Sequence, residues 1–170
     1  MAKGRGFAKK VQGFLNPRPK KDEQEFGPGK EGIIMCPVCH AYYYKKSWHN
    51  DLEGLTPNRF AEHDIRFSTC PACEMKKGKT FEGEVIIKLS DELHKHDVLN
   101  AIHNSDEQAR DKDPMDRVLW ITDSGSEIRV YTSENQLAVK IGKKLDSALK
   151  GGKLDIQYSR EDVARVTWEK

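Results

Sequence analysis

Residues 36–49 read CPVCHAYYYKKSWH, and residues 70–73 repeat the first motif as CPAC. The chain has four cysteines, all in these two pairs: Cys36, Cys39, Cys70 and Cys73. Two C-x2-C pairs separated by thirty residues are typical of a four-cysteine zinc ribbon, because each pair turns both thiolates to one side and the chain between them returns as a hairpin. The spacing predicts one structural Zn²⁺ bound by four thiolates, with His40 outside the ligand set.

Two other uses of paired cysteines fit the sequence less well. A disulfide framework belongs to secreted chains, and the leading residues MAKGRGFAKKVQGF lack the continuous apolar stretch of a secretory signal. A redox C-x-x-C normally occurs once, near a βαβ unit, and not twice with a proline inside each pair. We therefore expect reduced cysteines and a cytoplasmic protein.

Positive charge is concentrated at the start of the chain. The net charge is only +2, yet the first 21 residues hold seven cations and no acidic residue. Interleaved glycines and prolines predict that residues 1–31 form a disordered basic arm, which either binds RNA or only keeps the protein soluble. A transit peptide would be rich in serine, and these 21 residues contain none. No apolar run approaches the roughly 18 residues of a membrane span, so no membrane contact is expected.

The hydrophobic pattern divides the remaining chain into a zinc ribbon over residues 32–80 and an α+β domain over residues 81–170. GEVIIKL (83–89) is a β-branched run of strand length. A helix is predicted to begin at Ser90 as N-cap and to continue through the SDELHKHDVLNAIHNSDEQARDKD segment. Its predicted apolar stripe consists of Leu93, Val98, Leu99 and Ile102.

The second half of the α+β domain has an equally clear pattern. DRVLWIT and SEIRVYT are two strands joined by turn residues 123–125. Ser133 and Gln136 fit a capping box for a second helix that ends at Gly151-Gly152. Its apolar face is Leu137, Ile141, Leu145, Ala148 and Leu149. KLDIQYS and VARVTW supply two last strands, so the order is the ferredoxin-like β-α-β-β-α-β with an extra C-terminal strand, two helices covering one face of the sheet.

These motifs resemble a known family. The double C-P-x-C, the stretch YYYKKSWH and the segment VLWITDSGSEIRVYTSENQLAVKIGKKL (118–145) are similar to small uncharacterised bacterial zinc-ribbon proteins, over about residues 30–170. That family is similar to the amino-terminal zinc-ribbon and α+β part of the archaeal and eukaryotic adaptor that escorts the large ribosomal subunit out of the nucleus. The adaptor has more C-x-x-C pairs and further domains, so the resemblance implies contact with ribosomal RNA or ribosomal proteins and not a role in export.

The aromatic stretch behind the first cysteine pair has two interpretations. Alternation in a strand places Tyr42 and Tyr44 on one face and Tyr43 on the other. We predict that Tyr43 is the exposed ring, with Lys45 on the same face and Trp48 nearby, an arrangement suited to stacking unpaired bases. The alternative is that the α+β domain covers the second face and all the rings pack. The lysines near the cysteine pairs have a structural alternative too, since they would offset the negative charge of a four-thiolate zinc site.

Catalysis is the hypothesis from another class. A catalytic zinc keeps an open ligand position, whereas four cysteines close the site. The sequence has no H-E-x-x-H, G-x-S-x-G or phosphate-binding glycine loop. His94, His96 and His103 lie on one predicted helix, but none of their separations is the i, i+4 of a ligand pair.

We therefore expect a protein with no catalytic residues and no small-molecule substrate, which binds RNA and associates with the ribosome in assembly, translation or dormancy. The alternative is a zinc-ribbon adaptor that binds proteins and not nucleic acid; salt dependence separates the two, because phosphate contacts release counterions. The candidate RNA-binding residues are Lys3, Arg5, Lys9, Lys10, Arg18, Lys20, Lys21, Tyr43, Lys45, Lys46, Trp48, Lys140, Lys143 and Lys144.

Overall fold

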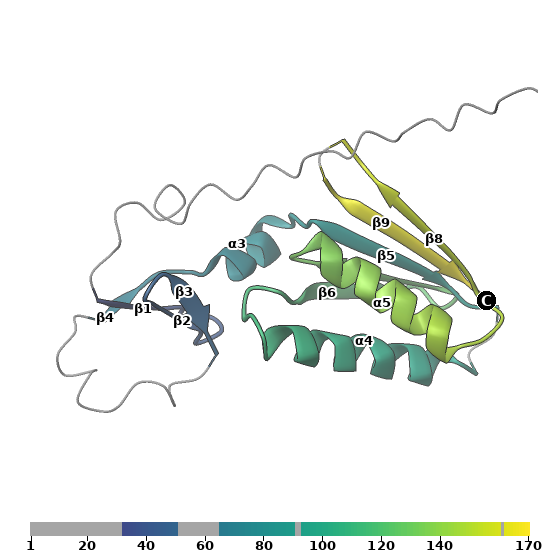
Figure 1. Cartoon of the computed structure of the whole chain (residues 1–170), viewed down its shortest axis with the longest axis horizontal. Coiled ribbons are helices and arrows are strands. Elements are labelled where there is room, and N and C mark those ends of the chain that lie inside the picture. Colours follow the sequence, from purple (N-terminus) through teal and green to yellow (C-terminus); the bar gives the residue numbers. More distant parts are fainter. Residues whose placement is uncertain (1–31, 51–64, 91–92, 161) are drawn as a thin grey trace, which may run out of the picture.

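The computed structural model describes residues 32–50, 65–90, 93–160 and 162–170, which form two sheets and three helices (Figure 1). The basic arm predicted for residues 1–31 lies outside the described residues. The predicted α+β class is confirmed, with a ribbon followed by a larger mixed domain.

The ribbon is a sheet of short strands. It contains β1 (Ile33–Met35), β2 (Tyr42–Tyr44), β3 (Ser47–His49) and β4 (Ile65–Phe67), in the order β3-β2-β1-β4. The strand β1 is antiparallel to β2 and parallel to β4. Helix α3 (Pro71–Gly78) follows at the second cysteine pair and was not predicted.

The α+β domain has the predicted order of elements. Strand β5 (Gly83–Lys88) leads to helix α4 (Lys95–Arg110), and the hairpin of β6 (Val118–Asp123) and β7 (Glu127–Thr132) leads to helix α5 (Asn135–Ala148). Strands β8 (Lys153–Tyr158) and β9 (Ala164–Glu169) complete it. Both helices cover one face of the sheet (Figure 1).

The last strand takes a place that the sequence pattern did not predict. The sheet order is β6-β7-β5-β9-β8, with β9 parallel to β5 and antiparallel to β8. In a ferredoxin-like sheet the strand that follows the second helix lies beside the first strand. Here β9 occupies that place beside β5, and β8, which follows α5, lies at the sheet edge. The physical reason is burial: Ala164, Val166 and Trp168 are fully buried, whereas Leu154 and Ile156 of β8 are only half-buried at the sheet edge.

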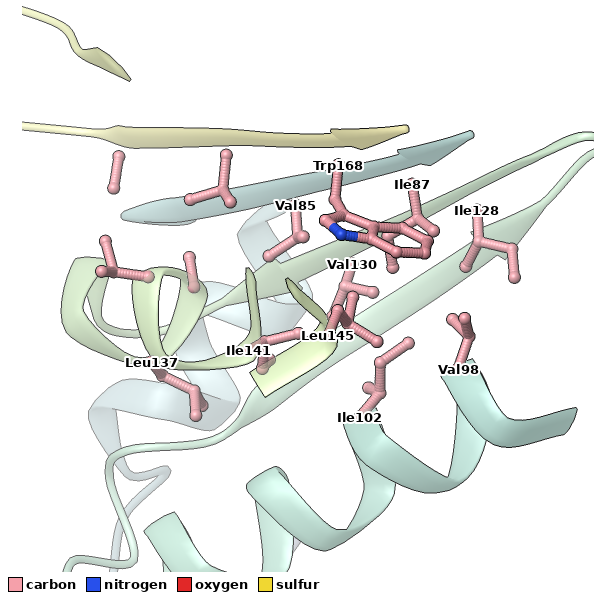
Figure 2. Close-up of a cluster of buried hydrophobic side chains, with 14 of the residues drawn as sticks. Val85, Ile87, Val98, Ile102, Ile128, Val130, Leu137, Ile141, Leu145 and Trp168 are labelled. Carbon is pink, nitrogen blue, oxygen red and sulfur yellow. The ribbon is translucent and has the colours of Figure 1, made fainter. Parts of the chain in front are cut away.

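The core lies between the sheet and the two helices, with Trp168 packed above the apolar faces of α4 and α5 (Figure 2). Val98 and Ile102 of α4 are buried as predicted. The prediction is wrong for Leu93 and Leu99, which are 79% and 37% exposed. Leu93 precedes the helix, and Leu99 is turned about 100° away from Val98. The buried face of α4 continues instead through Ser105 and Ala109.

The second helix follows its predicted stripe more closely. Leu137, Ile141, Leu145 and Leu149 are buried, and Ala148 is exposed.

Neither of the two predicted helix N-caps, Ser90 and Ser133, is correct. The backbone N–H of Ser90 donates to the carbonyl of Lys170, and α4 has His94 at its N-cap position. The Ser133 hydroxyl donates to the carbonyl of Met115, so this side chain joins the loop before β6 to the loop before α5.

Close packing of α5 on the sheet gives a stability prediction. A Cβ on Gly142 would lie 2.4 Å from Cγ1 of Val166 and 3.1 Å from Cδ1 of Leu154. Gly142→Ala is therefore expected to cost about 1–3 kcal/mol of unfolding free energy in urea titrations, because it overpacks the helix–sheet interface. Gly78→Ala is the control, since a Cβ there meets nothing within 4 Å. Equal stability of the two variants would contradict the prediction.

Candidate metal centre

The four cysteines lie together although the two pairs are far apart in the sequence. The sulfur atoms of Cys36, Cys39, Cys70 and Cys73, hereafter the cysteine cluster, are all within 4.8 Å of one another. All four are free thiols, and three of them are buried while Cys39 is half-buried. The spacing therefore predicted the grouping correctly.

The first pair is held in a tight turn at the end of β1. The N–H of Cys36 donates to the carbonyl of Ala41, and the N–H of His40 donates to the carbonyl of Cys36. His40 has a positive φ of 63°, which lets the chain turn back into β2 immediately after Cys39. The His40 side chain is exposed and is not one of the four clustered groups.

The second pair lies at the start of α3, the helix that sequence analysis missed. Cys70 is the N-cap residue, Pro71 occupies the first turn, and the N–H of Glu74 donates to the carbonyl of Cys70. Proline in the first turn of a helix is favoured because its fixed φ suits the helix and its missing N–H has no partner to lose. The sequence CPACEMKKG carried this signal. The helix start aims Cys70 and Cys73 toward the first pair.

The cluster has the donor set and the electrostatics of a metal site. Burial raises the pKa of Cys73 to about 11, and it also raises the pKa of Cys70. Burial acts in the same direction on Cys36, but backbone N–H groups of Cys39, Cys70 and Val38 outweigh it and lower the pKa of Cys36 to about 6. Four clustered thiolates, three of them buried, need a cation to offset their mutual repulsion.

The geometry fits a thiolate-binding metal. Tetrahedral metal–sulfur bonds of about 2.3 Å require sulfur atoms roughly 3.8 Å apart, which small side-chain rotations within the cluster can reach. One contact that such a site uses is already made, since the N–H of Cys70 donates to the sulfur of Cys36 at 3.4 Å. Hydrogen bonds of this kind orient the ligands. The cysteine cluster can therefore hold a metal ion.

The cluster is also the point where the ribbon packs on the α+β domain. Leu119 of β6 is 2% exposed and packs against the cysteines together with Ala72. Leu119 is the extra residue of a β-bulge, because Val118 pairs with Thr132 and Trp120 already pairs with Tyr131. A bulge re-aims a side chain. Here it places a leucine from an edge strand against the cysteine cluster.

Partly buried side chains from both parts surround this contact. They are Trp48 of β3, Met75 of α3, Phe81 before β5, Met115 before β6 and Trp120 of β6.

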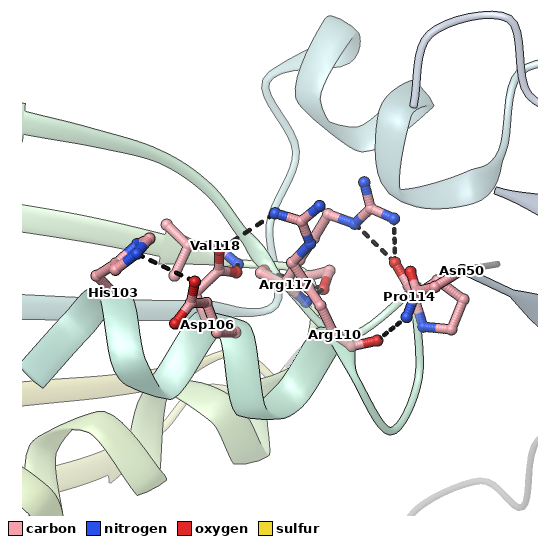
Figure 3. A network of polar contacts seen from close by, with 9 residues as sticks. Asn50, His103, Asp106, Arg110, Pro114, Arg117 and Val118 are labelled. Carbon is pink, nitrogen blue, oxygen red and sulfur yellow. Dashed lines mark hydrogen bonds and ion pairs between the residues drawn. The ribbon is translucent and has the colours of Figure 1, made fainter. Parts of the chain in front are cut away.

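A second connection between the ribbon and the α+β domain is polar: Asn50, which follows β3, donates to the carbonyl of Arg110 at the end of α4 (Figure 3). In the same region Arg117 donates to the carbonyl of Pro114, and the N–H of Val118 donates to Asp106. The ribbon is thus attached by packing and by the hydrogen bond from Asn50 to Arg110.

The prediction that Tyr43 is the exposed ring is wrong. Tyr43 is 5% exposed and Tyr42 is 3% exposed. The Tyr43 ring lies 5.5 Å from that of Trp48, which itself packs against the cysteine cluster. The face of the sheet that carries Tyr43 was predicted to be open to solvent, but the α+β domain covers it. This is the alternative interpretation, which strand alternation alone could not exclude.

The predicted cations lie in separate places. Lys45 and Lys46 form the β2–β3 turn and are both exposed. The Lys45 ammonium lies 5.5 Å from the centre of the Tyr44 ring. Lys140 and Lys143 are exposed and Lys144 is half-buried, but these three lie on α5, away from the hairpin turn (Figure 1). The predicted cations of the arm lie outside the described residues.

Comparison of the sequence with protein-family models and with curated proteins gives no match. Within the described part of the chain, no helix is both long enough and apolar enough to cross a membrane.

Metal binding and domain packing are expected to be coupled through Leu119. Leu119→Ala should cost about 2–5 kcal/mol of unfolding free energy, because it leaves a cavity beside the cysteines. It should also weaken metal retention against a coloured chelator, since the metal-binding free energy includes folding of the site. Ile121→Ala on the same strand is the control, because Ile121 is 43% exposed. If Leu119→Ala unfolds more easily but retains metal as strongly as wild type, the two are not coupled.

Proposed function

We propose that the protein is a non-catalytic RNA-binding protein whose ribbon is held together by one structural Zn²⁺. Zinc suits four thiolates in tetrahedral geometry, and four protein ligands leave no coordination position for a substrate. Three of the four cysteines are buried, so the cluster is largely shielded from water. A metal site of this kind supports a binding surface and does not activate water.

The observation that carries the proposal is the charge of the ribbon. Residues 32–80 contain seven cations and five acidic residues, whereas residues 81–170 contain 14 cations and 18 acidic residues. A ribbon with a net positive charge beside an α+β domain with a net negative charge favours contact of the ribbon with a polyanionic partner. Six of the seven ribbon cations lie among the described residues: Lys45, Lys46, Arg66, Lys76, Lys77 and Lys79.

The hairpin turn adds a second reason. Lys45 and Lys46 both have positive φ, 49° and 69°, as a two-residue type I′ turn requires. Asparagine and glycine adopt this conformation more easily than lysine does. Strained residues persist preferentially where they serve a function. Two lysines at the tip present adjacent positive charges to solvent, as contact with neighbouring phosphates requires.

The partner that we propose is ribosomal RNA in the cytoplasm. The support is the resemblance of the cysteine motifs and of residues 118–145 to the bacterial zinc-ribbon family and to the ribosomal export adaptor. A role in assembly, translation or dormancy follows from the same resemblance. The second candidate is a protein-binding adaptor, and the observation that favours it is the edge strand β4, whose three residues are all exposed.

The metal is tested by elemental analysis of the purified protein. We expect about one equivalent of zinc per chain and loss of both the metal and the ribbon fold in Cys70→Ser. Cys70 suits this test because it is buried and starts α3. Four thiolates also bind iron, which gives a red protein, whereas a zinc site is colourless. The colour of the purified protein therefore distinguishes the two metals. A wild-type protein that stays folded without any metal would contradict the structural role.

RNA binding is tested at the hairpin turn with Lys45→Asn/Lys46→Gly. This double variant removes two cations but supplies the residues that a type I′ turn favours, so stability should be unchanged or higher. RNA affinity should fall, and the slope of log K against log salt should become shallower by roughly 0.7–0.9 for each phosphate that the two lysines neutralise in wild type.

The control for this test is Lys112→Asn/Lys150→Asn, which removes two exposed lysines from the α+β domain. It should leave both the affinity and the slope near those of wild type. Co-sedimentation with ribosomal particles then asks whether the RNA is ribosomal. The adaptor becomes the better proposal if wild type binds ribosomal particles with no salt dependence, or binds protein and no RNA.

A further inference from the structure

Strand β8 forms the edge of the five-stranded sheet opposite β6 (Figure 1). The β6 edge is interrupted by the bulge at Leu119 and packs against the ribbon. Strand β8 has neither protection, since it contains no proline and its register with β9 is continuous over all six residues. A regular edge of this kind pairs readily with another strand, because its backbone N–H and C=O groups lack partners.

The hydrogen-bonding pattern shows which backbone groups of β8 point outward. The N–H of Ser159, directly after β8, donates to the carbonyl of Val163 across the turn to β9. Residues of an antiparallel pair alternate between those that bond to the partner strand and those that do not. The backbone groups of Leu154, Ile156 and Tyr158 therefore point away from β9, and no described strand lies on that side.

The same three residues carry apolar side chains. Leu154 and Ile156 are half-buried, and Tyr158 is 55% exposed. All three lie opposite buried residues of β9, so their side chains are on the helix-covered face and extend the core to the edge of the sheet. A strand added to this edge would gain backbone hydrogen bonds and apolar burial together.

The sequence of β8 is complementary to itself when two copies pair antiparallel about Ile156. Ile156 is then opposite Ile156 of the second copy, and Leu154 is opposite Tyr158. These are the residues whose backbone groups point outward, and both pairs are apolar. On the other face Asp155 is opposite Gln157, so a carboxylate meets a neutral amide that can donate to it.

The neighbouring registers are less suitable. A register centred on Asp155 places two carboxylates opposite each other, and like charges directly opposite destabilise a sheet. A register centred on Gln157 places Leu154 opposite Arg160 and so loses an apolar pair at each end. The charges and the apolar side chains of β8 thus select one register, and a second copy of the chain supplies the matching strand.

We propose that the protein forms a symmetric dimer in which two β8 strands pair antiparallel about Ile156. Such a contact uses the same surface of both copies and closes on itself. It joins the two five-stranded sheets and leaves a ribbon at each outer end, because the ribbon packs at the β6 edge. The paired strands are short, so the dimer is weak and depends on concentration. The inference goes beyond the proposed function and does not depend on RNA binding.

Sedimentation velocity of the full-length protein over a range of concentrations tests the dimer. Wild type should show a monomer–dimer equilibrium. Ile156→Lys should be monomeric, because it places two ammonium groups opposite each other at the two-fold axis. Ile121→Lys is the matched control, since Ile121 is a 43% exposed isoleucine on the opposite edge strand. It should dimerise like wild type, and circular dichroism checks that both variants are folded.

Two substitutions at the exposed Gln157 test the register without changing the core. Gln157→Lys places a cation opposite Asp155 of the second copy in two symmetric pairs, which should tighten the dimer about 2- to 30-fold. Gln157→Glu should weaken it by a similar factor. Within one copy Gln157 lies opposite Arg165, so any effect on the stability of the monomer would have the opposite sign.

Three results would overturn the inference. Wild type could stay monomeric up to about 1 mM, the range of the weakest specific contacts. Slow amide exchange at Leu154 and Ile156 would then show that residues 1–31 cover the edge instead. Ile156→Lys could dimerise like wild type, in which case another surface holds the copies together. Finally, the two Gln157 variants could change the dimer in the same direction, which excludes pairing about Ile156.

Discussion

The packing of the cysteine cluster against Leu119 is the contact on which the rest of the structure depends. The ribbon's strands are three residues long and cannot form a core by themselves. Four sulfurs, a leucine from the neighbouring domain and a surrounding shell of aromatic and methionine side chains supply one. A metal bound at the cluster would therefore determine both the ribbon's own fold and its position on the α+β domain.

This arrangement gives the α+β domain and the ribbon different properties. The α+β domain has a net negative charge and buries a large apolar core under its two helices. The ribbon is small and has a slight net positive charge, and it exposes its turn and its edge strand. A rigid scaffold that presents a charged element is a common design for binding sites. Because the cluster joins the two parts, damage to the cysteines would affect the fold and the position of the ribbon first.

The aromatic residues of the ribbon show that the solvent exposure of a ring depends on what packs over it. Alternation correctly divides Tyr42 and Tyr43 between two faces of the sheet, but both faces turn out to be covered. Phe67 has the same kind of side chain and lies in the same sheet, yet it is exposed because β4 is an edge strand. Which ring meets the solvent depends on which neighbours lie above it, and those neighbours are distant in sequence.

The sequence by itself determined the features that depend on local spacing. The C-x2-C pairs specify a four-sulfur cluster, because a knuckle turn fixes where its two thiolates point. The apolar periods of residues 81–170 specify the order of strands and helices, and the turn residues 123–125 specify the hairpin. Tertiary structure decided the rest. Insertion of β9 beside β5, the bulge that aims Leu119 at the cysteines, and the burial of Tyr43 all result from competition among apolar surfaces for the same buried space, and that competition has no signature in a local pattern.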